Sequence, residues 1–411
     1  MNLYIFNEKR RGSEYGVGTY IHELTVALRK SCINVCIVNL ASERPQIQTE
    51  TIDGVMYWYF PLAISDQRTS SNDRQWELYF HNIVYLLRLH IKDKNNLIFH
   101  LNYCQSAILA EKLKNAFKCK VIAVSHFSEW SFKIFDNLPR LRNILDDDGK
   151  QDILGEEIKK AFEEEKKYYT KVDHVICLSH YMRDVLCKDY GLKSTKISII
   201  PNALSDIVET SINTEQLRKK WNIQEKEKII LYAGRIDDIK GVVYLIKAFH
   251  KVVLDYPNSR LIIVGTGDYD RCFKEAKKIS TKITFTGFLC KKDLYELYRI
   301  AFMGVIPSLF EPFGYVAIEM MMYGIPVVVT KTSGLNEVVE KTCGLKTPLI
   351  ISSDNNVEID INLLSDNILY LLQHPVEAKQ MGENGRKRYL ENYSSKIFSK
   401  NMLHLYESIY F

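Results

Sequence analysis

Residues 308–319 read Ser-Leu-Phe-Glu-Pro-Phe-Gly-Tyr-Val-Ala-Ile-Glu, between an apolar run at Phe302–Ile306 and a helical pattern at Val316–Tyr323. The apolar run predicts a buried strand. The proline and the glycine keep Glu311 out of the helix, whereas Glu319 lies about one turn inside it. This order predicts a strand, loop and helix unit in which two carboxylates face a crevice beyond the carboxyl end of the strand.

The same order of apolar run, loop and helical pattern recurs along the chain, and it favours open parallel sheets flanked by helices. In the first half, the expected strands are Leu3–Phe6, Asn34–Leu40, Asn96–His100, Lys120–Val124, His174–Leu178 and Ile197–Ile200. In the second half, they are Ile229–Ala233, Arg260–Val264, Ile283–Thr286, Phe302–Ile306 and Pro326–Val329. We therefore predict an α/β protein with two doubly wound, Rossmann-like domains and a cleft between them. The predicted domains are residues 1–203 and 204–389, with a helix at about 390–411 that packs back on the first domain.

The composition excludes several classes of protein. The chain has 411 residues, 46% hydrophobic and 26% charged, which suits two globular domains rather than a disordered chain. Its net charge of +5 is too small over this length to indicate a nucleic-acid-binding protein. No apolar stretch reaches the ~18–20 residues that span a membrane, and the start of the chain lacks the order of a signal peptide. The nine cysteines include no Cys-x-x-Cys pair, so we expect free thiols, a reducing cytoplasm and no metal site.

Two further strand-to-helix turns carry groups that bind anions. Residues 233–241 contain Arg235 and Lys240, a planar fork and a compact point charge that together can neutralise a diphosphate without a metal. Residues 330–338 contain Gly334, which permits close backbone approach at a helix N-terminus. Each turn alone also fits solvated surface charges or a common turn, but three in one domain indicate a ligand site.

Taken in order, these turns resemble the signature of the retaining glycosyltransferases of family four, which have the GT-B fold of two facing Rossmann-like domains. The resemblance spans about residues 1–410 and is strongest at 230–340. The matching residues are Gly234-Arg235, Lys240-Gly241, Phe285-Thr286-Gly287, Glu311-Pro312-Phe313-Gly314, Glu319, Ser333-Gly334 and Glu337-Val338-Val339.

The resemblance implies a site for a nucleotide-sugar co-substrate, with UDP- or GDP-hexoses as the default donors and no separate cofactor or metal. Arg235 and Lys240 would hold the diphosphate, Glu311 would bind the donor sugar, and Glu319 would bind the ribose hydroxyls. The other implied contacts are backbone support of the sugar by Phe313 and Gly314, the base at Gly287-Phe288-Leu289, and the phosphates at Gly334 and Leu335.

The N-terminal half resembles the family with two departures. The family's glycine loop corresponds to Gly16 and Gly18, but Tyr15 stands where a glycine is usual. His126 ends a strand and would face the donor sugar near the reacting carbon, but Phe127 replaces the usual aspartate. The implied catalytic set is therefore His126, Glu311, Arg235 and Lys240.

Other patterns in the chain indicate no second chemistry. Gly265-Thr266-Gly267 lacks the third glycine of a dehydrogenase fingerprint, and Asp146-Asp147-Asp148 fits a solvated loop better than a metal site. His100 also ends a strand, and we interpret it as structural or as lying on the acceptor side.

The favoured hypothesis is a metal-independent, retaining hexosyltransferase, a bacterial and cytoplasmic enzyme of carbohydrate biosynthesis that can act at the inner face of the membrane. A nucleotide-sugar epimerase on the same fold is an alternative, and a non-catalytic nucleotide-sugar-binding protein is another. The acceptor is open between a glycan, a lipid-linked sugar, a peptide and a small molecule. It is expected on the N-terminal domain and on the segment 127–171, which carries Trp130, Phe132, Lys133, Phe135, Arg140 and Arg142.

Overall fold

The computed structural model describes residues 1–8, 16–29, 31–62, 73–92, 94–102, 106–147, 149, 152–208, 213–352 and 356–410. The chain divides into two compact units. Unit 1 consists of Met1–Glu129, Asp147–Asn202 and Ser395–Phe411, and unit 2 consists of Trp130–Asp146 and Ala203–Ser394. Residues Trp130–Asp146 therefore group with unit 2, whereas the predicted boundaries at 1–203 assigned them to the first domain. One reason is apolar packing within unit 2, where the Phe132 ring meets the Phe310 ring edge-on at 5.0 Å between centroids.

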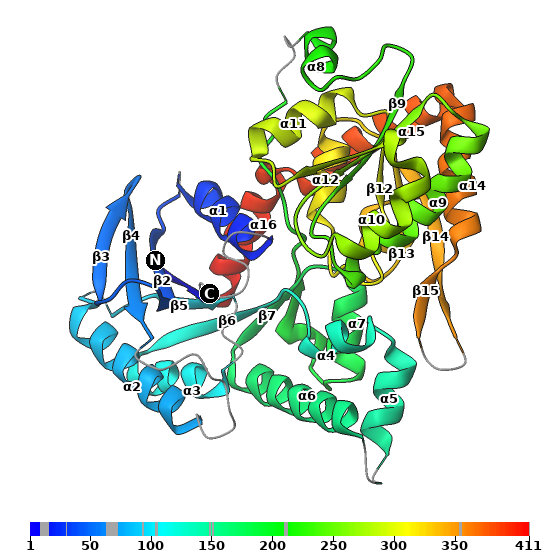
Figure 1. Cartoon of the computed structure of the whole chain (residues 1–411). Helices are drawn as coiled ribbons and strands as arrows, with labels where there is room; N and C mark the ends of the chain where they lie inside the picture. The colour runs from blue at the N-terminus through cyan, green and yellow to red at the C-terminus, as the bar shows by residue number, and fades with distance from the viewer. Residues whose placement is uncertain are drawn as a thin grey trace. The chain divides into compact units, whose positions relative to one another are not determined.

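Unit 1 is built on an eight-stranded sheet in the order β3-β4-β2-β1-β5-β6-β7-β8 (Figure 1). The chain leaves β1 toward β2 in one direction and continues from β5 through β8 in the other, which makes the sheet doubly wound. All its neighbouring strands are parallel except the β3–β4 hairpin. The strands are β1 (Asn2–Glu8), β2 (Asn34–Ser42), β3 (Gln48–Ile52), β4 (Val55–Pro61), β5 (Leu97–Leu101), β6 (Cys119–Ser125), β7 (His174–Cys177) and β8 (Ile197–Ile199).

The helices of unit 1 flank this sheet, and its α-helices bury apolar side chains. They are α1 (Gly16–Leu28), α2 (Asp73–His90), α3 (Ala107–Ala116), α6 (Ile153–Lys171), α7 (His180–Lys188), the short 3-10 helix η3 (Ser194–Lys196) and α16 (Ser395–Tyr410). Helix α3 packs against α2 and α6, while α1 packs against the C-terminal helix α16. Helix α16 buries Phe398, Met402, Leu405 and Tyr406, which recur at helical spacing.

Unit 2 is built on a seven-stranded sheet in the order β11-β10-β9-β12-β13-β14-β15, also doubly wound (Figure 1). Only the β14–β15 pair is antiparallel. The strands are β9 (Lys228–Ala233), β10 (Ser259–Val264), β11 (Ile283–Gly287), β12 (Met303–Ile306), β13 (Val327–Lys331), β14 (Gly344–Ile351) and β15 (Val357–Ile359).

The helices of unit 2 pack around a continuous apolar core. This core contains central residues of β9, β10 and β12 together with the buried face of α9, including Leu245, Phe249 and Val252. The helices are α4 (Glu129–Ile134), α5 (Leu138–Asp146), α8 (Thr214–Lys220), η4 (Asp238–Lys240), α9 (Val242–Asp255), α10 (Asp270–Ala276), η5 (Lys277–Lys282), α11 (Lys291–Ile300), α12 (Tyr315–Met322), α13 (Leu335–Val338), α14 (Ile361–Gln373), α15 (Pro375–Arg388) and the π-helical turn η6 (Tyr389–Tyr393).

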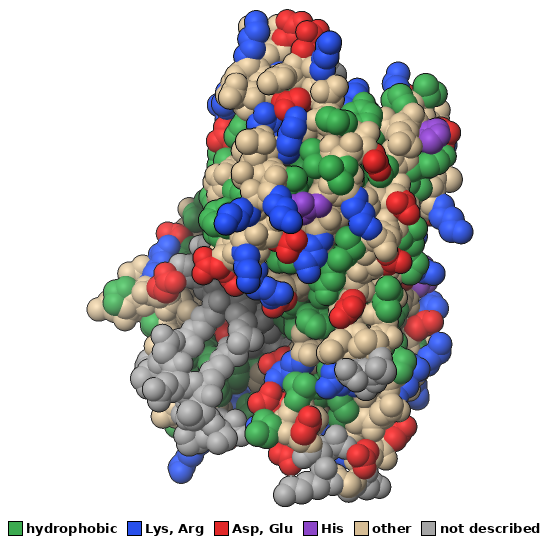
Figure 2. Space-filling model, turned by 45° about the vertical axis from the view of Figure 1, so that its right-hand side comes forward, with side chains coloured by type: hydrophobic (Ala, Val, Ile, Leu, Met, Phe, Trp, Pro, Cys, Tyr) green, Lys and Arg blue, Asp and Glu red, His purple; other side chains and the backbone are tan. Residues whose placement is uncertain are grey.

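The surface and the cysteines add little to this picture. On the face shown in Figure 2, Lys and Arg side chains are interspersed with Asp and Glu, and neither sign forms a continuous field. Among the described residues, no helix has the length and apolarity needed to cross a lipid bilayer. The cysteines in the described ranges are free thiols.

Candidate active site

The predicted site lies where the strand order of unit 2 reverses. Strands β9 and β12 are parallel neighbours, but the chain leaves β9 toward β10 and leaves β12 toward β13. Helices after such strands lie on opposite faces of the sheet, so a crevice opens beyond the strand ends. The loop after β9 carries Arg235 and Lys240, and the loop after β12 carries Glu311. The structure therefore brings these two predicted loops to one edge of the sheet.

A glycine allows the two loops to touch. Gly241 has a φ of 65°, and a Cβ built on it would lie 1.9 Å from the carbonyl oxygen of Pro307. The Leu309 N–H also donates to the Ile239 carbonyl oxygen at 2.7 Å. The Asp237 carboxylate accepts a hydrogen bond from the backbone N–H of Lys240 at 3.0 Å and so caps the η4 turn.

This packing places Lys240 beside Glu311. The Lys240 Nζ lies 2.5 Å from Glu311 Oε2, and the two side chains are only 20% and 17% exposed. The Arg235 guanidinium is half exposed and forms an ion pair with the Asp237 carboxylate at 3.1 Å. A charge-assisted hydrogen bond in such shielded surroundings is stronger than one in water. The protein thus holds Lys240 and Glu311 side by side at the sheet edge. A ligand with both charged and hydroxyl groups can replace either side chain as the partner of the other.

Backbone donors lie in the neighbouring turns. The N–H groups of Phe313, Gly314 and Gly334 have no acceptor among the described residues. The turns carrying them are packed together, because a Cβ on Gly334 would lie 2.0 Å from the Pro312 carbonyl oxygen. Unpaired N–H groups in adjoining turns suit an anion or a hydroxyl oxygen.

The Leu335 position differs from the expected phosphate cap. Helix α13 is a single turn, Leu335–Val338, and the Leu335 N–H donates to the Glu311 carbonyl oxygen at 3.4 Å. This N–H is engaged within the protein, because the loop after β12 folds over the turn after β13. Gly334 remains the better donor of the two.

Glu319 occupies separate surroundings from Glu311. It lies on α12, is only 9% exposed, and accepts a hydrogen bond from the Tyr298 hydroxyl at 2.9 Å. Burial raises the pKa of Glu319, and the Tyr298 hydrogen bond opposes that shift. No ion pair joins Glu319 to Lys240 or Arg235. Of the four predicted charges, Lys240 pairs with Glu311, Arg235 pairs instead with Asp237, and Glu319 is a separate buried carboxylate.

The predicted base-binding turn is open. Gly287 ends β11 with a φ of 74°, and no atom lies within 4 Å of a Cβ built on it. Its carbonyl oxygen accepts from Gly265 N–H at 2.9 Å, which fixes the turn to the end of β10. The Phe288 side chain is 73% exposed, and Leu289 is half-buried. An exposed ring beside this open turn is compatible with a planar ligand.

His126 lies in unit 1 at the end of β6, 8% exposed. Its Nε2 lies 3.1 Å from the Asn102 Oδ1, so in the orientation assigned to that amide Nε2 carries the proton and Nδ1 can accept. Its ring also packs edge-on against Tyr20 on α1, at 4.9 Å. Burial lowers the pKa of His126 to about 3, so the imidazole is neutral. Gly16 and Gly18, expected in a loop, lie inside the first turn of α1, and Tyr15 lies outside the described residues.

His100 is structural in its contacts. Its Nε2 lies 3.3 Å from the Tyr20 hydroxyl, and its Nδ1 lies 3.0 Å from the Tyr406 hydroxyl on α16. Burial lowers the pKa of His100 to about 3. The residue thus joins α1 and α16 through β5, inside unit 1.

These two histidines predict a pH-dependent stability. The unfolded chain binds protons at both below a pH of about 6.5, whereas the folded chain does not until about pH 3. The free energy of unfolding therefore falls as the pH drops from about 6.5, by about 2 kcal/mol per histidine at pH 5. Urea unfolding at pH 7.5 and pH 5 should show a smaller loss in His126→Gln than in the wild type.

The matched control for that experiment is His81→Gln, which removes an exposed imidazole on α2. Glu165, whose pKa burial raises to about 7, is common to all three proteins and cancels in the comparison. An equal loss of stability in His126→Gln and in the wild type would contradict the assignment of a neutral, buried His126.

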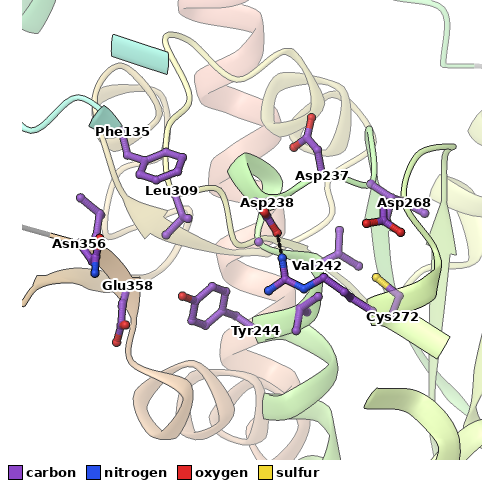
Figure 3. A pocket seen from close by; sticks show the side chains of 15 residues that line it. Phe135, Asp237, Asp238, Val242, Tyr244, Asp268, Cys272, Leu309, Asn356 and Glu358 are labelled. Atoms are coloured by element: carbon purple, nitrogen blue, oxygen red, sulfur yellow. Dashed lines mark hydrogen bonds and ion pairs between the residues drawn. The ribbon is translucent and has the colours of Figure 1, made fainter. Parts of the chain in front are cut away.

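A pocket of about 430 Å³ opens beside the η4 turn of unit 2 (Figure 3). Four carboxylates contribute to its lining, those of Asp237, Asp238, Asp268 and Glu358, against the single cation Arg271, which pairs with Asp238. A pocket of this charge disfavours a diphosphate. The residues predicted to hold the diphosphate and the donor sugar, Arg235, Lys240 and Glu311, do not line this pocket. No group of three metal-ligating side chains occurs in the described ranges.

Asp237, Tyr298, Asn102 and Tyr20 were not predicted from the sequence. Asp237 could have been found, because an aspartate three residues before Lys240 fits a helix cap. The other three reach their partners only through tertiary packing, and no spacing in the sequence indicates them.

Comparison with known proteins agrees with this architecture. The family described as Glycosyltransferase Family 4 matches residues 15–206, and the family described as Glycosyl transferases group 1 matches residues 213–388. A glycosyltransferase of Methanocaldococcus jannaschii is 35% identical over 176 residues, covering 40% of this chain and 44% of that protein. Mannosylfructose-phosphate synthase of Agrobacterium fabrum is 32% identical over 191 residues, covering 43% and 42%. The chain thus spans about half the length of these curated relatives.

Solved structures share the fold over the whole chain. Sucrose-phosphate synthase of Thermosynechococcus elongatus has a TM-score of 0.75 at 21% identity, covering 100% of this chain and 99% of that one. Anabaena HepE in complex with UDP-glucose has a TM-score of 0.71 at 14% identity, covering 99% and 100%. The protein belongs to the family-four type of glycosyltransferases, and its fold is GT-B, as the sequence resemblance implied.

Proposed function

We propose that the protein transfers a hexose from a nucleotide diphosphate to an acceptor with retention of the anomeric configuration. The observation that carries the proposal is the Lys240–Glu311 pair, held at 2.5 Å at the strand-order reversal of unit 2 beside unpaired backbone N–H groups. A transferred sugar requires both functions, a cation for the leaving diphosphate and a carboxylate for sugar hydroxyls. UDP-glucose in the Anabaena neighbour supports a donor of this class.

The reaction breaks the bond between the anomeric carbon and the β-phosphate oxygen, and it forms a bond from that carbon to an acceptor hydroxyl oxygen. Negative charge grows on the diphosphate as the sugar becomes cationic. Lys240 and Arg235 would stabilise the diphosphate, and donors at such a position each typically contribute ~3–4 kcal/mol. The acceptor proton would pass to the departing phosphate oxygen, on the face from which the phosphate leaves. Because the acceptor attacks from the face that the phosphate leaves, the configuration would be retained without a covalent enzyme intermediate.

The remaining groups would orient the sugar. Glu311 would exchange Lys240 for sugar hydroxyls, with Phe313 and Gly314 N–H groups beside it. Neutral His126 would accept a sugar hydroxyl at Nδ1 while Asn102 holds its Nε2. The proposed reaction uses no metal and no cofactor other than the donor. The transferred sugar is a hexose, and the acceptor is a glycan, a lipid-linked sugar or a peptide. The proposed setting is the bacterial cytoplasm, where such donors are made.

The test has two stages. Thermal-shift measurements with UDP, GDP, ADP and their hexose conjugates should show stabilisation by one nucleotide series. Incubation of the preferred donor with an acceptor panel should then give a product whose anomeric proton coupling by NMR matches that of the donor. Isomerised donor without any acceptor would instead support the epimerase. Donor binding without transfer to any acceptor would support a binding protein, and an inverted product would contradict retention.

A further inference from the structure

Glu319 is a buried carboxylate: burial raises its pKa, and the Tyr298 hydrogen bond and the charge of Lys291 oppose that shift. In the described part of the chain its one hydrogen bond comes from the Tyr298 hydroxyl, and no lysine or arginine forms an ion pair with it. Burying a carboxylate is costly unless its lone pairs are satisfied, and two oxygens can accept about four hydrogen bonds. Glu319 therefore retains acceptor capacity that the protein itself does not use.

Tyr298 fixes the direction of that capacity. It lies on α11, is 1% exposed, and its ring forms a cluster with the rings of Tyr295 and Tyr323, in which the three centroid distances are 5.6–5.8 Å. Burial raises the pKa of Tyr298 well above its ordinary value, so its hydroxyl stays protonated and donates to Glu319 Oε2. This ring cluster packs around the buried Tyr298 side chain and fixes the place from which its hydroxyl donates.

The chemistry that fits the remaining lone pairs is a vicinal diol. Two neighbouring O–H groups can donate to one carboxylate, and charged acceptors make such bonds worth more than neutral ones. Within a nucleotide-sugar donor, the ribose 2′- and 3′-hydroxyls form such a diol.

We propose that Tyr298 is a positioning residue that sets the preference of the donor site for ribonucleotides over deoxyribonucleotides, by holding one oxygen of Glu319 so that the rest of the carboxylate meets the ribose diol. This inference rests on the proposed function. It adds a residue that touches no ligand and acts only through Glu319.

The experiment measures nucleotide binding by calorimetry, without any acceptor. The probe is whichever of UDP, GDP and ADP stabilises the wild type most, together with its 2′,3′-dideoxy form. In the wild type the ribonucleotide should bind at least tenfold more tightly than the dideoxy form. In Tyr298→Phe the dissociation constant of the ribonucleotide should rise about tenfold, while that of the dideoxy form changes less than twofold. A loss of packing would weaken both probes equally, so the ratio separates positioning from structure.

Tyr295→Phe is the matched control, because Tyr295 lies one turn earlier on α11 and its ring belongs to the same cluster. It should keep the wild-type ratio. Glu319→Gln provides a second route if Tyr298→Phe folds poorly, and it should also collapse the ratio. Adding Tyr298→Phe to Glu319→Gln should then change the ratio no further.

The outcomes separate the two claims. Absence of binding by all three nucleotides to the wild type would overturn the proposed function. Binding with an unchanged ratio in Tyr298→Phe, or with no ribose preference in the wild type, would overturn the role of Tyr298 and leave the proposed function standing.

Discussion

Replacing Lys240 by alanine should reduce kcat/KM for sugar transfer by about 10²–10³-fold, the loss typical of removing a donor aimed at developing charge. The structure fixes Lys240 at its side chain and at its backbone, since its Nζ lies 2.5 Å from Glu311 Oε2 and its backbone N–H donates to the Asp237 carboxylate. Glu311→Ala should give a loss of the same order. The measurement is initial transfer rate against donor concentration, with product quantified by mass spectrometry.

Lys247→Ala is the control for this prediction, because Lys247 is an exposed lysine on the adjoining helix α9. It should retain transfer within about twofold. Circular dichroism and the unfolding midpoint of each variant establish that the fold is kept. Near wild-type turnover in folded Lys240→Ala and Glu311→Ala would remove these loops from the reaction.

Replacing Gly241 by alanine should destabilise unit 2 by about 3–5 kcal/mol, at the upper end of single substitutions. Two effects add at this position. A φ of 65° is unfavourable for any residue with a Cβ, and that Cβ would lie 1.9 Å from the Pro307 carbonyl oxygen. The backbone must shift to relieve the overlap, and the shift moves Lys240 away from Glu311. Urea unfolding of the variant and of the wild type measures the loss.

Gly324→Ala separates the two effects. Gly324 also lies in unit 2, with a φ of 69°, but the nearest atom to its added Cβ is at 3.8 Å. Only the conformational cost remains, and the expected loss is about 1–2 kcal/mol. Similar losses in the two variants would show that the approach of Gly241 to Pro307 is not tight in solution.

The fold could be predicted where burial on both faces makes a strand apolar throughout. Such runs as Ile229–Ala233 and Arg260–Val264 lie in β9 and β10 within one residue of the expected ends. The hairpin β3–β4 was missed, because Gln48–Ile52 is mostly exposed and its polar residues resemble a loop. The Asp53-Gly54 pair at its turn, with both residues at positive φ, was the available signal.

The strands β14 and β15 were missed for a related reason. Strand β15 lies at the edge of the sheet in unit 2, and β14, between β13 and β15, is only partly buried along its length. Their exposed positions, including Ile350 and Ile351, weaken the apolar pattern that identifies a central strand.

The placement of the predicted site residues at strand ends could be derived from the sequence, whereas the residues that support them could not. Arg235, Lys240 and Glu311 stand at strand ends, and topology alone brings such ends together. The sequence could not show that Glu319 is buried with the Tyr298 hydroxyl as its hydrogen-bond donor, because this contact with α11 arises only through tertiary packing. The grouping of Trp130–Asp146 with unit 2 was likewise hidden, since it depends on contacts such as Phe132 with Phe310.

The position of α16 in unit 1 has a consequence for folding during synthesis on the ribosome. Because residues 395–410 complete that unit, the surface of α1 that they cover stays open while the ribosome is still making everything between. The second half can close its own core first, reversing the usual N-to-C order of domain maturation. Throughout that interval Tyr20 on α1 lacks the ring of Phe398 that packs against it at 5.6 Å in the finished chain.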